Sequence, residues 1–244
     1  MNILLAAVGF INNNILYNKN KIIDILKKYC NKTDLIVFGE AFLQGFDSLT
    51  WDYEKDTSIA LLQNSEVISE IRDNARKYNT AISFGYIEKE NEEIYSSQIT
   101  IDNKGNIINN YRRISTGWKE QGVSNNYKEG KSFQKFILND LTFSVGLCGD
   151  LWYDENVKKI RDLKTDIVLW PVYVDFNYKE WNEAIKYEYA TQAKNIGTNV
   201  LLVNSYCLDV EEENIASGGA IMFKNGEIVK EEKAGYEKVL LITI

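Results

Sequence analysis

The chain has 244 residues, of which 45% are hydrophobic and 26% are charged, an ordinary balance for a globular protein. Its net charge is −7 and it carries no basic stripe, which argues against binding to nucleic acid or to an anionic membrane. No apolar run approaches the length of a membrane span, and the apolar start lacks the basic region of a signal peptide. These features predict a cytoplasmic protein.

Three cysteines and no histidine narrow the possible chemistry. The cysteines are odd in number and widely spaced, so they indicate neither a disulfide framework nor a Cys-x-x-Cys pair. The lack of histidine excludes Ser-His-Asp triads, Cys-His pairs and nearly all zinc hydrolase sites. Any acid–base chemistry must therefore come from Glu, Asp, Lys, Tyr or Cys.

Predicted strands and helices alternate at both ends of the chain, with hairpins between them. The expected strands are Asn2–Gly9, Asp34–Phe38, Thr80–Ile87, Ile94–Ile101, Asn106–Tyr111, Phe133–Leu138, Leu141–Leu147, Asp166–Trp170, Thr198–Asn204 and a last strand from Val239. The expected helices are Asn18–Tyr29, Ser58–Tyr78, Asn156–Leu163 and Tyr178–Asn195. This order predicts an α/β fold with a mixed sheet or two packed sheets.

The chain shows no repeat and no linker rich in Pro, Gly or Ser, so residues 1–244 are expected to form a single domain. The charge run Glu211–Glu213 is expected to be a solvated loop.

A first candidate for chemistry is Glu40, which directly follows the apolar strand Asp34–Phe38. Open α/β sheets place their sites at the carboxyl ends of strands. Desolvation there would raise the pKa of a carboxyl group toward neutrality, as a general base requires. The alternative is a carboxylate that merely ends a strand.

A second candidate is Cys148, where the apolar strand Leu141–Leu147 runs straight into Cys-Gly-Asp. A turn at a strand end projects a nucleophile out of the sheet, and Gly149 allows a backbone N–H to approach an oxyanion closely. The alternative is a buried thiol that acts as a small hydrophobic residue, the interpretation given to Cys30 and Cys207.

Six segments in order resemble the nitrilase superfamily of carbon–nitrogen hydrolases, over almost the whole chain. They are IVFGEAFLQGF (36–46), NNYRRISTGWKE (109–120), VGLCGDLWYDE (145–155), TDIVLWP (165–171), WNEAIKYEYATQAKNIGTNVLLVN (181–204) and SGGAIMFKNGEIV (217–229). The resemblance implies a four-layer α-β-β-α sandwich that pairs as a homodimer, with the helix Tyr178–Asn195 and the last strand at the interface. It also implies that Glu40 is the acid–base residue and Cys148 the nucleophile.

One position departs from the family pattern. The catalytic lysine of the family normally follows Tyr-Arg, where this chain has Arg113, and the nearest lysine is Lys119. Arg113 would supply a fixed charge, Lys119 would reach the site from a shifted loop, or the cation would be lost and the protein would only bind a small molecule. Glu120 is the nearest candidate for the family's supporting glutamate, and its alternative is a loop carboxylate.

The implied reaction uses a thiolate, a thioester and a water activated by Glu40, so no metal and no cofactor are expected. The substrate would be a small amide, carbamoyl compound or nitrile. Asp150 is expected mainly to hold the Cys148 turn. Trp118, Trp152, Trp170 and Tyr173 lie near predicted strand ends and would line a small pocket, with core packing as the alternative for each.

Overall fold

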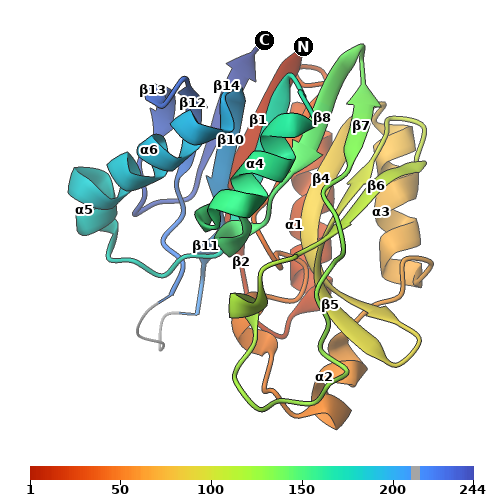
Figure 1. Ribbon diagram of the computed structural model, residues 1–244. Helices are drawn as coiled ribbons and strands as arrows, with labels where there is room; N and C mark the ends of the chain where they lie inside the picture. The colour runs from red at the N-terminus through yellow and green to blue at the C-terminus, as the bar shows by residue number, and fades with distance from the viewer. Residues whose placement is uncertain (210–214) are drawn as a thin grey trace.

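Two six-stranded sheets packed face to face form the centre of the molecule (Figure 1). The computed structural model describes residues 1–209 and 215–244, so the charge run Glu211–Glu213 lies outside the described residues. The first sheet has the order β14-β1-β3-β4-β5-β6. Its strands are β1 (Asn2–Ala7), β3 (Leu35–Val37), β4 (Ala81–Glu90), β5 (Glu93–Ile101), β6 (Ile107–Arg112) and β14 (Lys238–Thr243).

The second sheet has the order β13-β12-β10-β9-β8-β7. Its strands are β7 (Lys135–Leu138), β8 (Leu141–Val145), β9 (Ile167–Val172), β10 (Asn199–Asn204), β12 (Ala220–Lys224) and β13 (Glu227–Glu232). A small pair joins β2 (Gly9–Phe10) to β11 (Tyr206–Cys207). Three neighbouring strands are parallel in each sheet: β1, β3 and β4 in the first, and β8, β9 and β10 in the second. The strands joined by hairpins, such as β4–β5 and β7–β8, are antiparallel.

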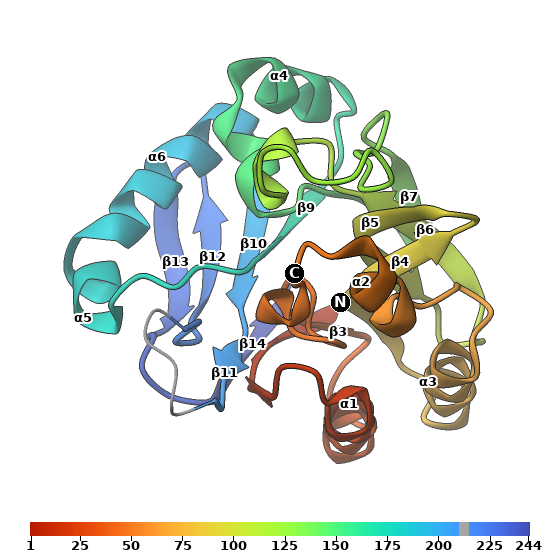
Figure 2. The same cartoon turned by 90° about the horizontal axis from the view of Figure 1, so that it is seen from below.

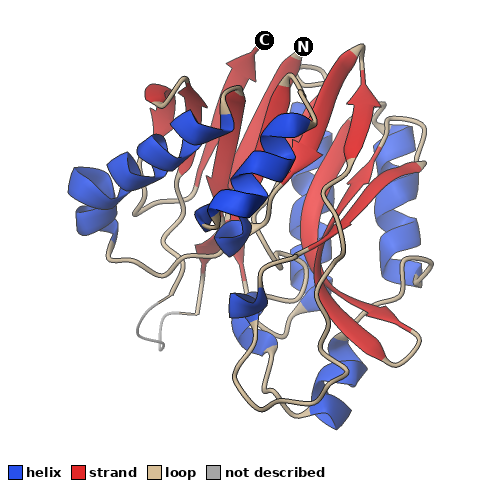
Figure 3. Cartoon of the chain, in the orientation of Figure 1, coloured by secondary structure: helices blue, strands red, loops and turns tan. Residues whose placement is uncertain are grey.

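Helices cover the outer face of each sheet (Figure 3). On the first sheet, α1 (Ile15–Tyr29) and α3 (Glu66–Lys77) bury Leu26 and Ile71 in one cluster with residues of β1 and β4. On the second sheet, α4 (Asp154–Asp162) and α6 (Lys186–Ile196) bury Ile160 and Ile196. The layers are therefore helix, sheet, sheet, helix, and the predicted four-layer sandwich is confirmed.

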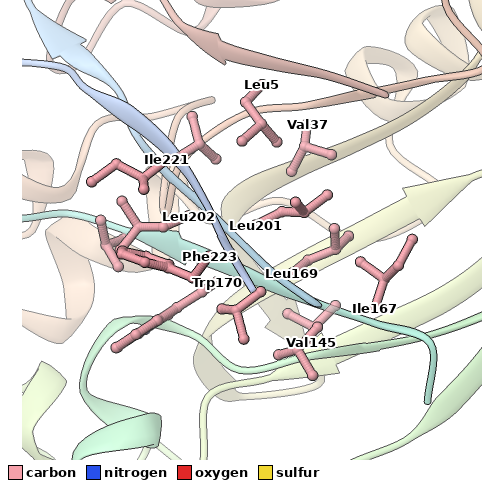
Figure 4. Packing of buried hydrophobic residues seen from close by; sticks show 14 of the residues in the cluster. Leu5, Val37, Val145, Ile167, Leu169, Trp170, Leu201, Leu202, Ile221 and Phe223 are labelled. Atoms are coloured by element: carbon pink, nitrogen blue, oxygen red, sulfur yellow. The ribbon is translucent and has the colours of Figure 1, made fainter. Parts of the chain in front are cut away.

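The core between the sheets is apolar (Figure 4). Leu5 and Val37 from the first sheet belong to the same buried cluster as Val145, Leu169 and Leu201 from the second, and all five are fully buried. Apolar burial of this kind is the main favourable term in folding.

Two predicted helices differ from the structure. The predicted helix Ser58–Tyr78 is two helices, α2 (Tyr53–Ile59) and α3, because Ala60 takes an extended conformation and the Ser65 hydroxyl caps α3 by accepting from the N–H of Ile68. The predicted helix Tyr178–Asn195 starts as α5 (Tyr178–Glu180) and contains one π-helical segment, Trp181–Ile185, before α6. Within the described ranges, no helix is both long and apolar enough to span a bilayer.

The ends of β3, β8 and β9 meet at one end of the sandwich, which is seen from below in Figure 2. The backbone N–H of Glu40, after β3, donates to the carbonyl of Val172 at the end of β9 (3.3 Å). The thiol of Cys148, after β8, donates to the carbonyl of Tyr173 (3.5 Å). Segments from both sheets thus touch where the sequence places its two main candidates.

Candidate active site

Glu40 is a buried carboxylate with one oxygen in use and one free. Its Oε1 accepts from the Ser96 hydroxyl (2.9 Å) and from Nη1 of Arg113 (2.9 Å). Its Oε2 is buried and has no hydrogen-bond partner among the residues that the structure describes. Gly85 makes room for the chain here, since a Cβ on Gly85 would lie 2.7 Å from the carbonyl carbon of Glu40. The free oxygen is the feature that a proton acceptor needs.

Cys148 occupies a sharp turn between β8 and the short 3-10 helix Cys148–Trp152. Its φ is +40°, a left-handed value that is uncommon outside glycine and that is found at strained functional turns. The Trp170 indole N–H holds the turn by donating to the Cys148 carbonyl (2.9 Å). Cys148 as a whole residue is half-buried.

Burial and the nearby Glu40 carboxylate raise the pKa of the Cys148 thiol to about 12, although the Arg113 charge acts in the opposite direction. A thiol with this pKa is protonated at neutral pH. A base must therefore take its proton before it can act as a nucleophile.

Arg113 supplies a positive charge at the same place. Its Nε donates to the Ser115 hydroxyl (2.9 Å), and its Nη1 pairs with Glu40 (2.9 Å). Its Nη2 lies close to Gly149: a Cβ added to Gly149 would be 2.6 Å from it. Burial works against its charge, but Glu40, Cys148 and Asp150 together raise its pKa above the ordinary value. The guanidinium is therefore a fixed cation in contact with the nucleophile turn.

Lys119 and Glu120 are placed differently from the predicted site. The Lys119 ammonium donates to the Tyr127 carbonyl (2.6 Å) and pairs with Glu129 (2.7 Å); in the described part of the chain it has no ion pair with Glu40. Glu120 is exposed on the same loop. The physical reason is that the chain leaves β6 directly after Arg112, so Arg113 faces Glu40 while the later residues follow the loop outward.

Asp150 is fully buried, and both of its oxygens accept hydrogen bonds from this chain. The donors are the Tyr111 hydroxyl and the backbone N–H groups of Ile114, Ser115 and Leu147. Burial raises its pKa, while the hydrogen bonds from Tyr111 and Ser115 act in the opposite direction. Asp150 ties the Arg113 segment to the Cys148 turn, and no direct role in substrate binding follows from these contacts.

Three of the four predicted aromatic residues lie near the thiol. Trp170 and Tyr173 bond the Cys148 turn directly, and Trp152 packs against Trp170 with ring centroids 6.1 Å apart. Trp118 instead packs against Trp51 (6.0 Å) in a separate cluster. Pocket lining by all four stays a prediction.

Sequence reasoning missed Ser96 and Ser115, which hold Glu40 and Arg113, and Tyr111, which holds Asp150. The available signal was alternation in β5, where Ser96, Gln98 and Thr100 share one face. That pattern predicts a solvent face, yet all three are buried because the second sheet covers them.

A second buried Glu–Arg pair lies on the opposite face of the same strands. The Glu88 side chain points away from the inner face of β4. Its carboxylate accepts hydrogen bonds from Nη2 of Arg112 (2.7 Å) and from the Ser97 hydroxyl (2.6 Å). The donors to its two oxygens also include Gln63 and Asn110. Burial acts to raise the pKa of Glu88, but these bonds outweigh it and lower the pKa. Unlike Glu40, Glu88 has both oxygens hydrogen-bonded.

Within residues 1–209 and 215–244, no group of three His, Cys, Asp or Glu side chains is arranged to hold a metal ion. The candidate site consists of the Glu40 carboxylate, the Cys148 thiol and the Arg113 guanidinium.

The profile of the family described as "Carbon-nitrogen hydrolase" matches residues 7–244. The chain belongs to the carbon–nitrogen hydrolase family. Among curated relatives, glutamine-dependent NAD(+) synthetase of Aquifex aeolicus is 21% identical over 100% of this chain and 42% of its own length. Cyanide hydratase of Stereum hirsutum is 28% identical over 57% of this chain and 40% of its own length. This carbon–nitrogen hydrolase therefore spans less than half the length of both relatives.

Solved structures show the same fold. An amidase from Nesterenkonia sp. AN1, in which acrylamide has added to the active-site cysteine, superposes with a TM-score of 0.80. It is 14% identical, and the match covers 100% of this carbon–nitrogen hydrolase and 93% of the amidase.

Proposed function

We propose that this carbon–nitrogen hydrolase cleaves a non-peptide carbon–nitrogen bond in a small amide, carbamoyl compound or nitrile, through a thioester on Cys148. The observation that carries the proposal is Oε2 of Glu40, which is buried without a hydrogen-bond donor among residues 1–209 and 215–244, while Arg113 and Ser96 hold Oε1. The same carboxylate is close enough to the Cys148 thiol to raise its pKa. A buried acceptor without a donor is costly to the fold, and a nearby thiol proton would satisfy it.

For an amide, the first half of the reaction forms the thioester. Oε2 of Glu40 takes the thiol proton, and the Cys148 sulfur attacks the carbonyl carbon. The oxyanion that forms is stabilised by the Arg113 guanidinium and by the backbone N–H of Gly149; one such donor contributes about 3 kcal/mol to lowering the barrier. The carbon–nitrogen bond then breaks, and the protonated Glu40 donates its proton to the departing ammonia or amine.

The second half releases the acid. Glu40, again ionised, takes a proton from a water molecule, and the resulting hydroxide attacks the thioester carbon. The carbon–sulfur bond breaks, and the proton held by Glu40 returns to the sulfur. Arg113 keeps its charge throughout, because a guanidinium does not act as a proton donor near neutral pH.

A non-catalytic binding protein is the alternative when the family lysine is missing. The contact of Arg113 with both Glu40 and Gly149 favours an enzyme, because it puts a cation beside the carboxylate and the nucleophile turn.

The deciding experiment measures ammonia release from a panel of small amides, carbamoyl compounds and nitriles. Wild type should release ammonia from at least one member. Cys148→Ala should abolish the release, and Glu40→Gln should lower kcat by a factor on the order of 1000. Cys30→Ala is the matched control, since the Cys30 thiol donates to the carbonyl of Lys27 in α1, and it should retain full activity.

Release that persists in Cys148→Ala would refute the nucleophile assignment. No release by wild type from any member would favour the binding protein.

A further inference from the structure

One oxygen of Asp150 fixes the chain directly after Arg113. Oδ1 accepts from the backbone N–H of Ile114 (3.0 Å) and of Ser115 (2.7 Å), at the point where the chain leaves β6. The Ser115 hydroxyl in turn accepts from Nε of Arg113 (2.9 Å). Oδ1 therefore sets the position of the group that orients the guanidinium.

The other oxygen of Asp150 fixes the nucleophile turn. Oδ2 accepts from the backbone N–H of Leu147, the residue before Cys148, at 2.9 Å. It also accepts from the hydroxyl of Tyr111 at 2.6 Å. Tyr111 lies on β6, two residues before Arg113, and is buried. One carboxylate thus joins the first sheet, which carries the cation, to the second sheet, which carries the thiol.

We infer that Asp150 and Tyr111 are positioning residues that hold the Arg113 guanidinium against the Cys148–Gly149 segment. The inference rests on the proposed function. Both oxygens of Asp150 are engaged by groups of this chain, so its carboxylate acts through Arg113 and the turn. An oxyanion donor is most effective when it is already fixed before the charge develops, and such fixing requires supporting hydrogen bonds.

The charge of Asp150 acts in the same direction as its geometry. Together with Glu40 and Cys148, it raises the pKa of Arg113 against the effect of burial. Arg113 therefore remains charged although it is buried. The four hydrogen bonds to Asp150 fix the segments on either side of its guanidinium.

The test compares Tyr111→Phe with Tyr127→Phe. Tyr127 is a matched control, because it is also fully buried and its hydroxyl also donates to a buried carboxylate, Asp56 (2.7 Å). Both variants lose one hydrogen bond of the same kind, so both should show a similar drop in melting temperature. Only Tyr111→Phe should lower kcat, on the order of 10- to 100-fold with KM nearly unchanged, because a small misplacement of a catalytic group has effects of this size.

A second readout does not need the substrate. The rate of Cys148 alkylation by iodoacetamide, measured against pH, reports the pKa of the thiol. In Tyr111→Phe the guanidinium is less well held, so the alkylation profile should move to higher pH than in wild type and in Tyr127→Phe. Asp150→Asn should move it further, since an amide cannot accept at both positions.

Equal kcat values and superimposable alkylation profiles for Tyr111→Phe and Tyr127→Phe would overturn the inference. Failure of the proposed function is a different outcome, in which wild type releases no ammonia. The alkylation profiles of the two tyrosine variants can still be compared in that case, because alkylation does not need the substrate. Should Asp150→Asn fail to fold, the two tyrosine variants decide the matter.

Discussion

At the scale of single residues, the cation at the candidate site is Arg113, and its own set of neighbours supports it. Arg113 is a planar fork, and each of its three nitrogens has a separate neighbour: Ser115, Glu40 and Gly149. A lysine has one nitrogen and could not make these contacts together. Arg113 is therefore accommodated by its surroundings, in particular by a residue without a side chain at position 149.

The two candidate cations can be compared directly. Arg113→Met should lower kcat/KM by a factor on the order of 1000, because it removes an oxyanion donor. It should also raise the pKa of Cys148 further, since the Arg113 charge lowers that pKa in wild type. Lys119→Met should change neither quantity, because its partners are Tyr127 and Glu129. The measurements are steady-state kinetics and the pH profile of iodoacetamide alkylation.

Arg113→Lys is the folding control, since it keeps a charge beside the buried Glu40 carboxylate. Losses of similar size in Arg113→Met and Lys119→Met would contradict the assignment of the cation to Arg113.

At the scale of elements, the nucleophile turn and the end of β6 are fitted to each other. Gly149→Ala would place a Cβ 2.6 Å from Nη2 of Arg113 and so displace the guanidinium. We expect kcat to fall about 100-fold while the fold is retained. Gly117→Ala, in the segment that follows β6, is the control because a Cβ there meets nothing within 4 Å. Kinetics and thermal melting of the two variants check this; wild-type kcat in Gly149→Ala would show that Nη2 is not needed.

Strand positions could be predicted from the sequence better than side-chain partners. Apolar runs such as Asp34–Phe38 mark central strands, and β3 was found there because a strand buried on both faces requires such a run. Glu40 and Cys148 could be proposed because each follows a strand end. The break in Ser58–Tyr78 was missed, because the apolar spacing continues across a cap that depends on Ser65.

The partners of Glu40 could not be predicted, because they come from distant segments. Ser96 lies 56 residues from Glu40 in the chain, and Arg113 lies 73 residues away. Only the packing of one strand beside another places them on the same carboxylate. The choice between Arg113 and Lys119 depended on where the chain leaves β6, which no local pattern specifies.

At the scale of the whole molecule, the homodimer stays a prediction. We expect pairing through α6 and the last strand, β14, as the resemblance implies. Tyr187 on α6 is 55% exposed, and burial of such a side chain would favour association. Tyr187→Glu should therefore weaken the dimer. Leu16→Glu is the control, since Leu16 is 65% exposed on α1, on the opposite outer layer.

Light scattering coupled to size-exclusion chromatography checks this prediction. Wild type and Leu16→Glu should show twice the mass of one chain, and Tyr187→Glu should dissociate on dilution. A wild-type protein with the mass of one chain at all concentrations would contradict it.

The two Glu–Arg pairs on opposite faces of β4, β5 and β6 show how the fold distinguishes a structural group from a reactive one. In each pair, a serine hydroxyl and an arginine guanidinium donate to the glutamate. The donors to Glu40 are Ser96 and Arg113, and the donors to Glu88 are Ser97 and Arg112. They differ in their hydrogen bonds: both oxygens of Glu88 accept hydrogen bonds, whereas one oxygen of Glu40 has no donor in the part of the chain that the structure describes. An unsatisfied buried acceptor destabilises a protein by about 1–3 kcal/mol. At this carboxylate, the cost falls on the oxygen that the proposed reaction assigns as the proton acceptor.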